Sequence, residues 1–149
     1  MSGKKIAVIG VILVLILGGG LFGVHSINQN KETFQGISLP LQGVSDEQRE
    51  RWLGLLDDAM KKEEVLKVIV ETSDYQSLMG SESEEAAVAD LGKRIQVNYR
   101  ERKGTMEIGL GGKRKEVDKM KEVAPEIYKI LANYTASMDP EFSEFVSSR

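Results

Sequence analysis

Basic side chains are concentrated between Lys93 and Lys115, where only Glu101 and Glu107 oppose them. Alternating apolar residues on both sides of a polar turn predict a β-hairpin here, which would bring the two ends of the stretch together. Such a patch can attract an anionic glycan, phospholipid head groups or an acidic partner. The alternative is a solvated hairpin balanced by the acidic segment 82–90. The candidate anion-binding residues are Lys93, Arg94, Arg100, Arg102, Lys103, Lys113, Arg114 and Lys115.

Residues suited to catalysis or metal binding are few. His25 is the only histidine and cysteine is absent, which excludes disulfides, thiolate metal sites and a cysteine nucleophile. Carboxylate pairs such as Asp57–Asp58 are adjacent on a predicted helix, so their side chains point in different directions. The segment Gly109–Lys113 superficially resembles a phosphate-binding loop but lacks its spacing. We therefore predict no enzyme, no catalytic residues, no metal and no cofactor.

The segment Ile6–Val24 contains no charged residue, and as a helix it would extend roughly 28 Å. Lys4 and Lys5 precede it, and basic flanks stay cytoplasmic. This pattern predicts a single-pass signal-anchor with a cytoplasmic N-terminus and an extracytoplasmic C-terminal domain. A cleaved signal peptide is the alternative. Gly19 and Gly23 form one GxxxG pair and are the helix-packing candidates.

Three regions follow from this pattern: an anchor or signal at 1–26, a polar linker at 27–33 and one extracytoplasmic domain at 34–149. The chain has 23 acidic and 20 basic residues, and two of the basic ones precede the apolar segment. An acidic domain of this kind lacks the dominant positive field of a general nucleic-acid binder.

Periodicity predicts the elements of the first half of the domain. An edge strand is expected at 34–39. Ser45 and Gln48 form a capping box that begins a helix, and Ser83 begins another. The apolar segment 65–70 favours a helix, although its valines leave a strand as the alternative.

In the second half, the hairpin strands are expected at 95–99 and 106–110, and Gly111–Gly112 is expected to close the hairpin. A long helix should follow from about Lys115, with a kink or break caused by Pro125. A last helical turn should bring Phe142 and Phe145 against the core. The predicted fold class is α+β: an N-terminal transmembrane helix, then a small antiparallel sheet packed on one face by helices.

Segments between about 65 and 134 resemble the extracytoplasmic domain of the Wzz-type family of polysaccharide chain-length determinants and co-polymerases. The resemblance rests on 64–69 (EVLKVI), 84–97 (EEAAVADLGKRIQV), 104–108 (GTMEI) and the helical pattern 127–134. It implies a non-catalytic domain that assembles into a large oligomer and acts in polysaccharide synthesis or export.

Two functions remain open from the sequence. The first is a non-enzymatic assembly or regulatory subunit of the cell envelope, linked to polysaccharide synthesis or export. The second is a membrane-anchored adaptor or binding module of a secretion or other envelope complex. The predicted partners are the membrane, envelope proteins, anionic glycan or lipid head groups, and further copies of the chain, but not nucleic acid.

Overall fold

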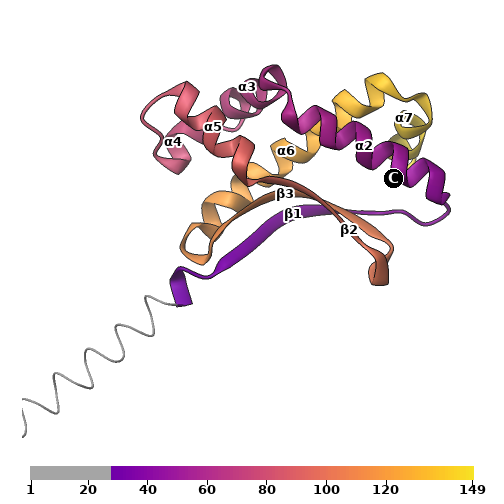
Figure 1. The fold of residues 1–149 in the computed structure, drawn as a ribbon, viewed down its shortest axis with the longest axis horizontal. Helices are drawn as coiled ribbons and strands as arrows, with labels where there is room; N and C mark the ends of the chain where they lie inside the picture. The colour runs from indigo at the N-terminus through magenta and orange to yellow at the C-terminus, as the bar shows by residue number, and fades with distance from the viewer. Residues whose placement is uncertain (1–27) are drawn as a thin grey trace, which may run out of the picture.

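The computed structural model describes residues 28–149, which form three strands and a set of helices (Figure 1). In chain order the elements are β1 (Glu32–Pro40), α2 (Asp46–Lys61), α3 (Glu63–Thr72), α4 (Tyr75–Met79), α5 (Glu84–Arg94), β2 (Ile95–Arg100), η1 (Glu101–Lys103), β3 (Thr105–Lys113), η2 (Arg114–Glu116), α6 (Val117–Met138) and α7 (Pro140–Ser147).

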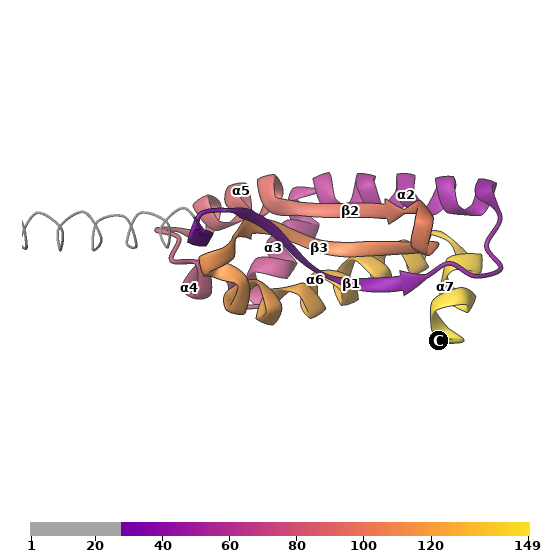
Figure 2. The same ribbon diagram turned by 90° about the horizontal axis from the view of Figure 1, so that it is seen from below.

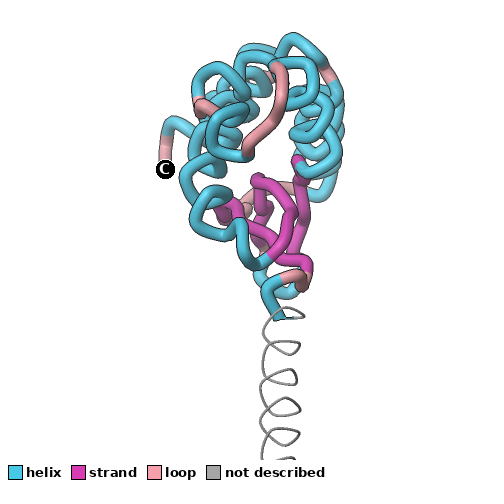
Figure 3. The backbone as a smooth tube through the Cα atoms, turned by 90° about the vertical axis from the view of Figure 1, so that its left-hand side faces the viewer, coloured by secondary structure: helices cyan, strands magenta, loops and turns pink. Residues whose placement is uncertain are grey.

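The strands form one antiparallel sheet in the order β1-β3-β2, so β3 is central. Ile108 of β3 lies opposite Ile37 on one side and Val97 on the other, which puts all three side chains on one face. The helices lie on this side of the sheet, and none of the described helices covers the opposite face (Figure 2). Seen along the long axis, helices and strands form two separate layers (Figure 3).

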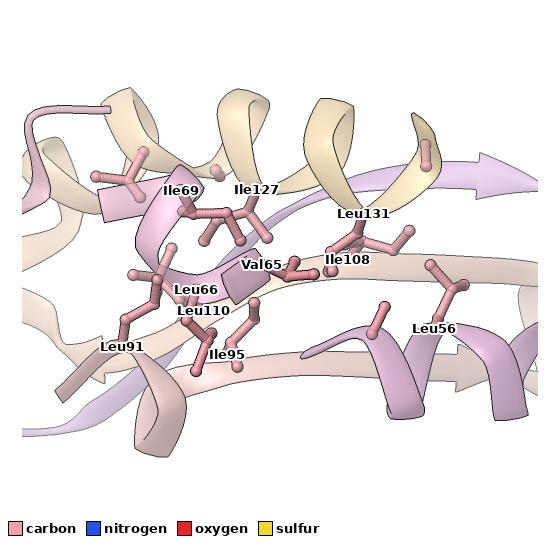
Figure 4. Packing of buried hydrophobic residues seen from close by; sticks show 14 of the residues in the cluster. Leu56, Val65, Leu66, Ile69, Leu91, Ile95, Ile108, Leu110, Ile127 and Leu131 are labelled. Carbon is pink, nitrogen blue, oxygen red and sulfur yellow. The ribbon is translucent and has the colours of Figure 1, made fainter. Parts of the chain in front are cut away.

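The core lies between the sheet and the helices (Figure 4). Ile108 and Leu110 of β3 meet side chains from the helical layer, and all of these residues are fully buried. The fully buried helical members include Leu56, Ile69, Leu91, Ile127 and Leu131. At the C-terminal end, Phe142 packs edge-to-face on Trp52, with ring centroids 5.2 Å apart. Helix α7 therefore closes one end of the core.

Several predicted elements are confirmed. The strand predicted at 34–39 lies within β1, at an edge of the sheet. The Ser45 hydroxyl accepts from the Gln48 N–H at 3.2 Å, and the Gln48 carboxamide oxygen accepts from the Ser45 N–H at 3.1 Å, which completes the capping box. The apolar segment 65–70 lies in the helix α3, as predicted. Its buried residues lie on one side of this helix.

One local expectation is wrong, and one of the two alternatives expected at Pro125 is excluded. Gly111 and Gly112 do not end the hairpin; they lie inside β3 and pair with Phe34 and Thr33 of β1, so the edge strand extends β3 beyond its contact with β2. Pro125 does not break α6, which runs from Val117 to Met138. Its ring is exposed, and buried residues on both sides of it pack against the core and hold the two halves in one helix.

The α+β part of the predicted fold class is confirmed. The predictions of a transmembrane helix, a single-pass signal-anchor and an extracytoplasmic location are contradicted. Within residues 28–149, no helix is both long enough and apolar enough to cross a membrane. The longest, α6, has 22 residues but carries six charged side chains between Asp118 and Lys129. These are Asp118, Lys119, Lys121, Glu122, Glu126 and Lys129. The apolar segment 6–24, with Gly19 and Gly23, lies outside the described residues.

Candidate anion-binding site

The hairpin separates the eight predicted basic residues into two groups. Lys93 and Arg94 end α5 just before β2, while Lys113 ends the antiparallel strand β3, so these residues meet at the open end of the hairpin. Arg114 and Lys115 follow directly. The Arg114 N–H donates to the carbonyl of Lys31, the residue just before β1, at 2.9 Å. We call this group the basic end. It consists of Lys31, Lys93, Arg94, Lys113, Arg114 and Lys115.

The other three residues lie at the turn of the hairpin. Arg100 is paired with Glu107 of β3, and the Arg100 Nε lies 2.8 Å from the Glu107 carboxylate. Arg102 and Lys103 belong to η1 and are exposed. The two ends of the stretch therefore meet as expected, and the length of the strands keeps the turn away from the basic end.

Three residues of the basic end line a cavity of about 310 Å³. Lys93 and Arg94 contribute from α5, Lys113 from β3, and Gln96 from β2. Lys93 and Lys113 are exposed, and neither makes an ion pair within residues 28–149. Three carboxylates also line the cavity, those of Glu32, Asp90 and Glu116. Asp90 and Glu116 are paired with Arg94, which leaves two lysines and Glu32 without an ion pair within residues 28–149.

Arg94 is held in place by two carboxylates. Its Nη1 and Nη2 lie 3.0 and 3.3 Å from the two oxygens of Glu116, and its Nε donates to Asp90 at 3.0 Å. The fully buried Tyr75 donates its hydroxyl to the other Asp90 oxygen at 2.7 Å. Glu116 also accepts from the Lys113 N–H at 2.8 Å. This network joins α4, α5, β3 and η2, and its members Asp90, Arg94 and Glu116 form part of the cavity wall.

Partial burial and ion pairing shift the pKa values of Glu116 and Arg94 in opposite directions. Burial disfavours the charge of Glu116, but hydrogen bonds from Arg94 and the Lys113 N–H outweigh it and hold the pKa of Glu116 below its ordinary value. Burial likewise opposes the Arg94 charge, yet its two carboxylate partners raise its pKa. The pKa of Tyr75 is raised mainly by its burial and further by its hydrogen bond to Asp90. Arg94 is thus committed to internal partners, and Lys93 and Lys113 supply the charge for an external anion.

Glycines in β3 make room for this arrangement. A Cβ at Gly112 would lie 2.7 Å from the Met120 sulfur and 2.9 Å from Arg94 Nη1, and a Cβ at Gly111 would lie 2.8 Å from Gln96 Nε2. The apparent similarity of 109–113 to a phosphate-binding loop therefore has another cause: these glycines belong to a strand that passes close to the side chains of the site.

Sequence reasoning missed Tyr75, Asp90, Gln96 and Glu116 as members of the site. The spacing of four between Asp90 and Arg94 is a signal for a helical ion pair and could have identified one of them. Tyr75 lies in the short helix α4, and no sequence pattern places its hydroxyl near Asp90. Among residues 28–149, no group of three or more acidic or histidine side chains is arranged to hold a metal ion. His25 lies outside this range.

No protein-family model, curated protein or solved structure matches this chain.

Proposed function

We propose that this protein is a non-enzymatic assembly or regulatory subunit that binds an anionic glycan through the basic end of its hairpin. The observation that carries the proposal is the pair of exposed lysines, Lys93 and Lys113, at one cavity from two different elements. The resemblance of 65–134 to the Wzz-type domain supports a glycan as the ligand and polysaccharide synthesis or export as the process.

The geometry suits a repeating acidic chain better than a single ion. Lys93 and Lys113 line the cavity, while Arg114 and Lys115 continue the positive charge next to it. Each exposed contact with an anion contributes only about 0.2–1 kcal/mol, because water screens it. Several such contacts along one polymer add up, whereas a single small anion would make only one or two of them.

The internal network gives the site a fixed frame. Because Arg94 is bound on both sides by Asp90 and Glu116, the end of α5 and the end of β3 keep their relative positions. The lysines on these two ends are therefore held near the cavity before a ligand arrives, which lowers the entropic cost of binding.

Binding of the full chain to immobilised polygalacturonate, an acidic glycan, and to dextran, a neutral one, tests the proposal. We expect binding to polygalacturonate that weakens steeply with added salt, and no comparable binding to dextran. The double variant Lys93→Gln, Lys113→Gln should weaken the acidic interaction about tenfold. Equal, salt-insensitive binding to the two glycans would overturn the proposal.

A further inference from the structure

The cavity at the basic end is lined by charges of both signs in equal number. Three basic side chains face it, and three carboxylates face it as well. A cavity that attracted every anion through charge alone would carry an excess of positive charge. The balance of the lining therefore bears on which kind of anion fits.

Half of these charges are already used inside the protein. Arg94 is paired with both Asp90 and Glu116, so this part of the wall carries one net negative charge. The other half is exposed and forms no ion pair within residues 28–149. It consists of Glu32, Lys93 and Lys113. A ligand thus meets two ammonium groups, one free carboxylate and a wall that does not attract further anions.

The register of the sheet places Glu32 beside a lysine and an amide. Glu32 is the pairing partner of Lys113, and Gln96 pairs with Gly109, which lies four residues before Lys113 on β3. Because side chains two residues apart on a strand share a face, Glu32, Gln96 and Lys113 all lie on the face opposite Ile108. None of the described helices covers this face (Figure 2).

These exposed groups include both hydrogen-bond donors and acceptors. The Glu32 carboxylate only accepts, and the lysine ammonium groups only donate. The Gln96 carboxamide oxygen accepts from Asn98 Nδ2 at 3.4 Å, which leaves the Gln96 nitrogen as a donor at the cavity. A hydroxyl group both donates and accepts, so hydroxyls suit this mixed lining. A fully ionised sulfate or phosphate group only accepts, and Glu32 repels it.

We propose that the cavity recognises a uronic acid residue, a sugar that carries one carboxylate among hydroxyl groups. The carboxylate binds between Lys93 and Lys113, while neighbouring hydroxyls donate to Glu32 and accept from Gln96. The cavity volume of about 310 Å³ is at the lower end of the range for ligand pockets and suits a single sugar ring. This proposal rests on the glycan binding proposed above and names the acidic sugar that the site prefers.

A more densely charged polymer is the alternative ligand. The basic residues outside the cavity, Lys31, Arg114 and Lys115, would attract its additional charges. Inside the cavity, each additional anionic group would meet Glu32 or the net negative charge around Arg94. Charge density alone favours the denser polymer, whereas the lining favours the uronic acid, so the two explanations predict opposite preferences.

Three polymers of matched length separate these explanations. Polygalacturonate has one carboxylate and free hydroxyls on each sugar, polyacrylate has closely spaced carboxylates without hydroxyls, and dextran sulfate has dense sulfate groups. Dissociation constants of the full chain for the three labelled polymers are measured by fluorescence anisotropy at one salt concentration and expressed per charged group. We expect polygalacturonate to bind at least about fivefold more tightly than either of the others.

The variant Glu32→Gln tests the lining itself. It should reduce the preference for polygalacturonate about threefold, mainly because polyacrylate and dextran sulfate bind more tightly once the repelling carboxylate is gone. Glu101→Gln is the matched control, since it removes the same charge from the exposed turn of the hairpin. It should leave the preference unchanged. Circular dichroism checks that both variants remain folded.

The outcomes distinguish this inference from the proposed function. If the unmodified protein does not bind polygalacturonate, both are overturned. If it binds polygalacturonate but binds polyacrylate or dextran sulfate equally well or better, only the preference for a uronic acid is overturned, because the site then responds to charge density. An unchanged preference in Glu32→Gln, or an equal loss in Glu101→Gln, would also overturn it.

Discussion

The Arg94 guanidinium forms a two-point contact with the Glu116 carboxylate, at 3.0 and 3.3 Å, although the two residues come from α5 and η2. Parallel contacts of this kind fix both distance and orientation. Because Glu116 also accepts from the Lys113 N–H, the same carboxylate sets the end of β3. The frame of the basic end therefore depends on this pair.

Replacing Glu116 with glutamine should destabilise the protein by about 1–3 kcal/mol, since Arg94 would lose one of its two charged partners at a half-buried position. Chemical denaturation measures the loss. The variant Glu122→Gln provides a matched control, because Glu122 is exposed on α6 and makes no ion pair within residues 28–149. Its free energy of unfolding should change by less than about 0.5 kcal/mol. Equal effects of the two substitutions would show that the Arg94 contact contributes nothing to stability.

The same pair predicts a pH dependence. The pKa of Glu116 is lower in the folded protein than its ordinary value of 4.5. Its contribution to stability is thus fully present above about pH 5 and is lost as the pH falls through the folded-state pKa. The difference in stability between the native protein and Glu116→Gln should therefore shrink on acidification. A difference that stays constant down to strongly acidic pH would contradict the assigned role of Glu116.

Gly112 should tolerate no larger residue. In Gly112→Ala the new methyl would lie 2.7 Å from the Met120 sulfur and 2.9 Å from Arg94 Nη1, so the core or the ion pair must shift, at a cost of about 1–3 kcal/mol. Gly54→Ala is the control, because no atom lies within 4 Å of the added Cβ and the position is inside α2. That change should stabilise the protein by about 0.5–1 kcal/mol. Thermal unfolding of both variants checks these opposite signs.

Trp52 reports on the docking of α7. Phe142 is fully buried against it, and its replacement by alanine should cost about 3–5 kcal/mol. Since Trp52 is the only tryptophan in the chain, its fluorescence should move to longer wavelength as water reaches the ring. Phe145 also contacts Trp52, with centroids 5.1 Å apart, but is only half-buried, so Phe145→Ala should have the smaller effect. The reverse order would contradict this packing of α7.

The sequence predicts the parts of this fold that have a local cause. The Ser45–Gln48 capping box begins α2 as expected, and alternation in 95–99 and 106–110 identifies the hairpin. Other parts depend on contacts between distant segments. The extension of β3 through Gly111 and Gly112 requires β1, which pairs there from the far end of the chain. No local rule contains that information.

The candidate site shows the same division. Charge counting finds the basic residues of the hairpin, but it cannot distinguish a committed cation from a free one. Arg94 belongs to the first kind because Asp90 and Glu116 converge on it from different elements. Lys93 and Lys113 belong to the second, and only their positions at the cavity reveal it.

The most direct test of glycan binding at the basic end compares two double variants that remove the same charge from opposite ends of one hairpin. Lys93→Gln with Lys113→Gln alters the cavity, and Arg102→Gln with Lys103→Gln alters the turn. Dissociation constants for polygalacturonate are measured at one low salt concentration. We predict about a tenfold weakening for the first variant and less than about twofold for the second. Equal weakening by both variants, or none by the first, would contradict binding at the cavity.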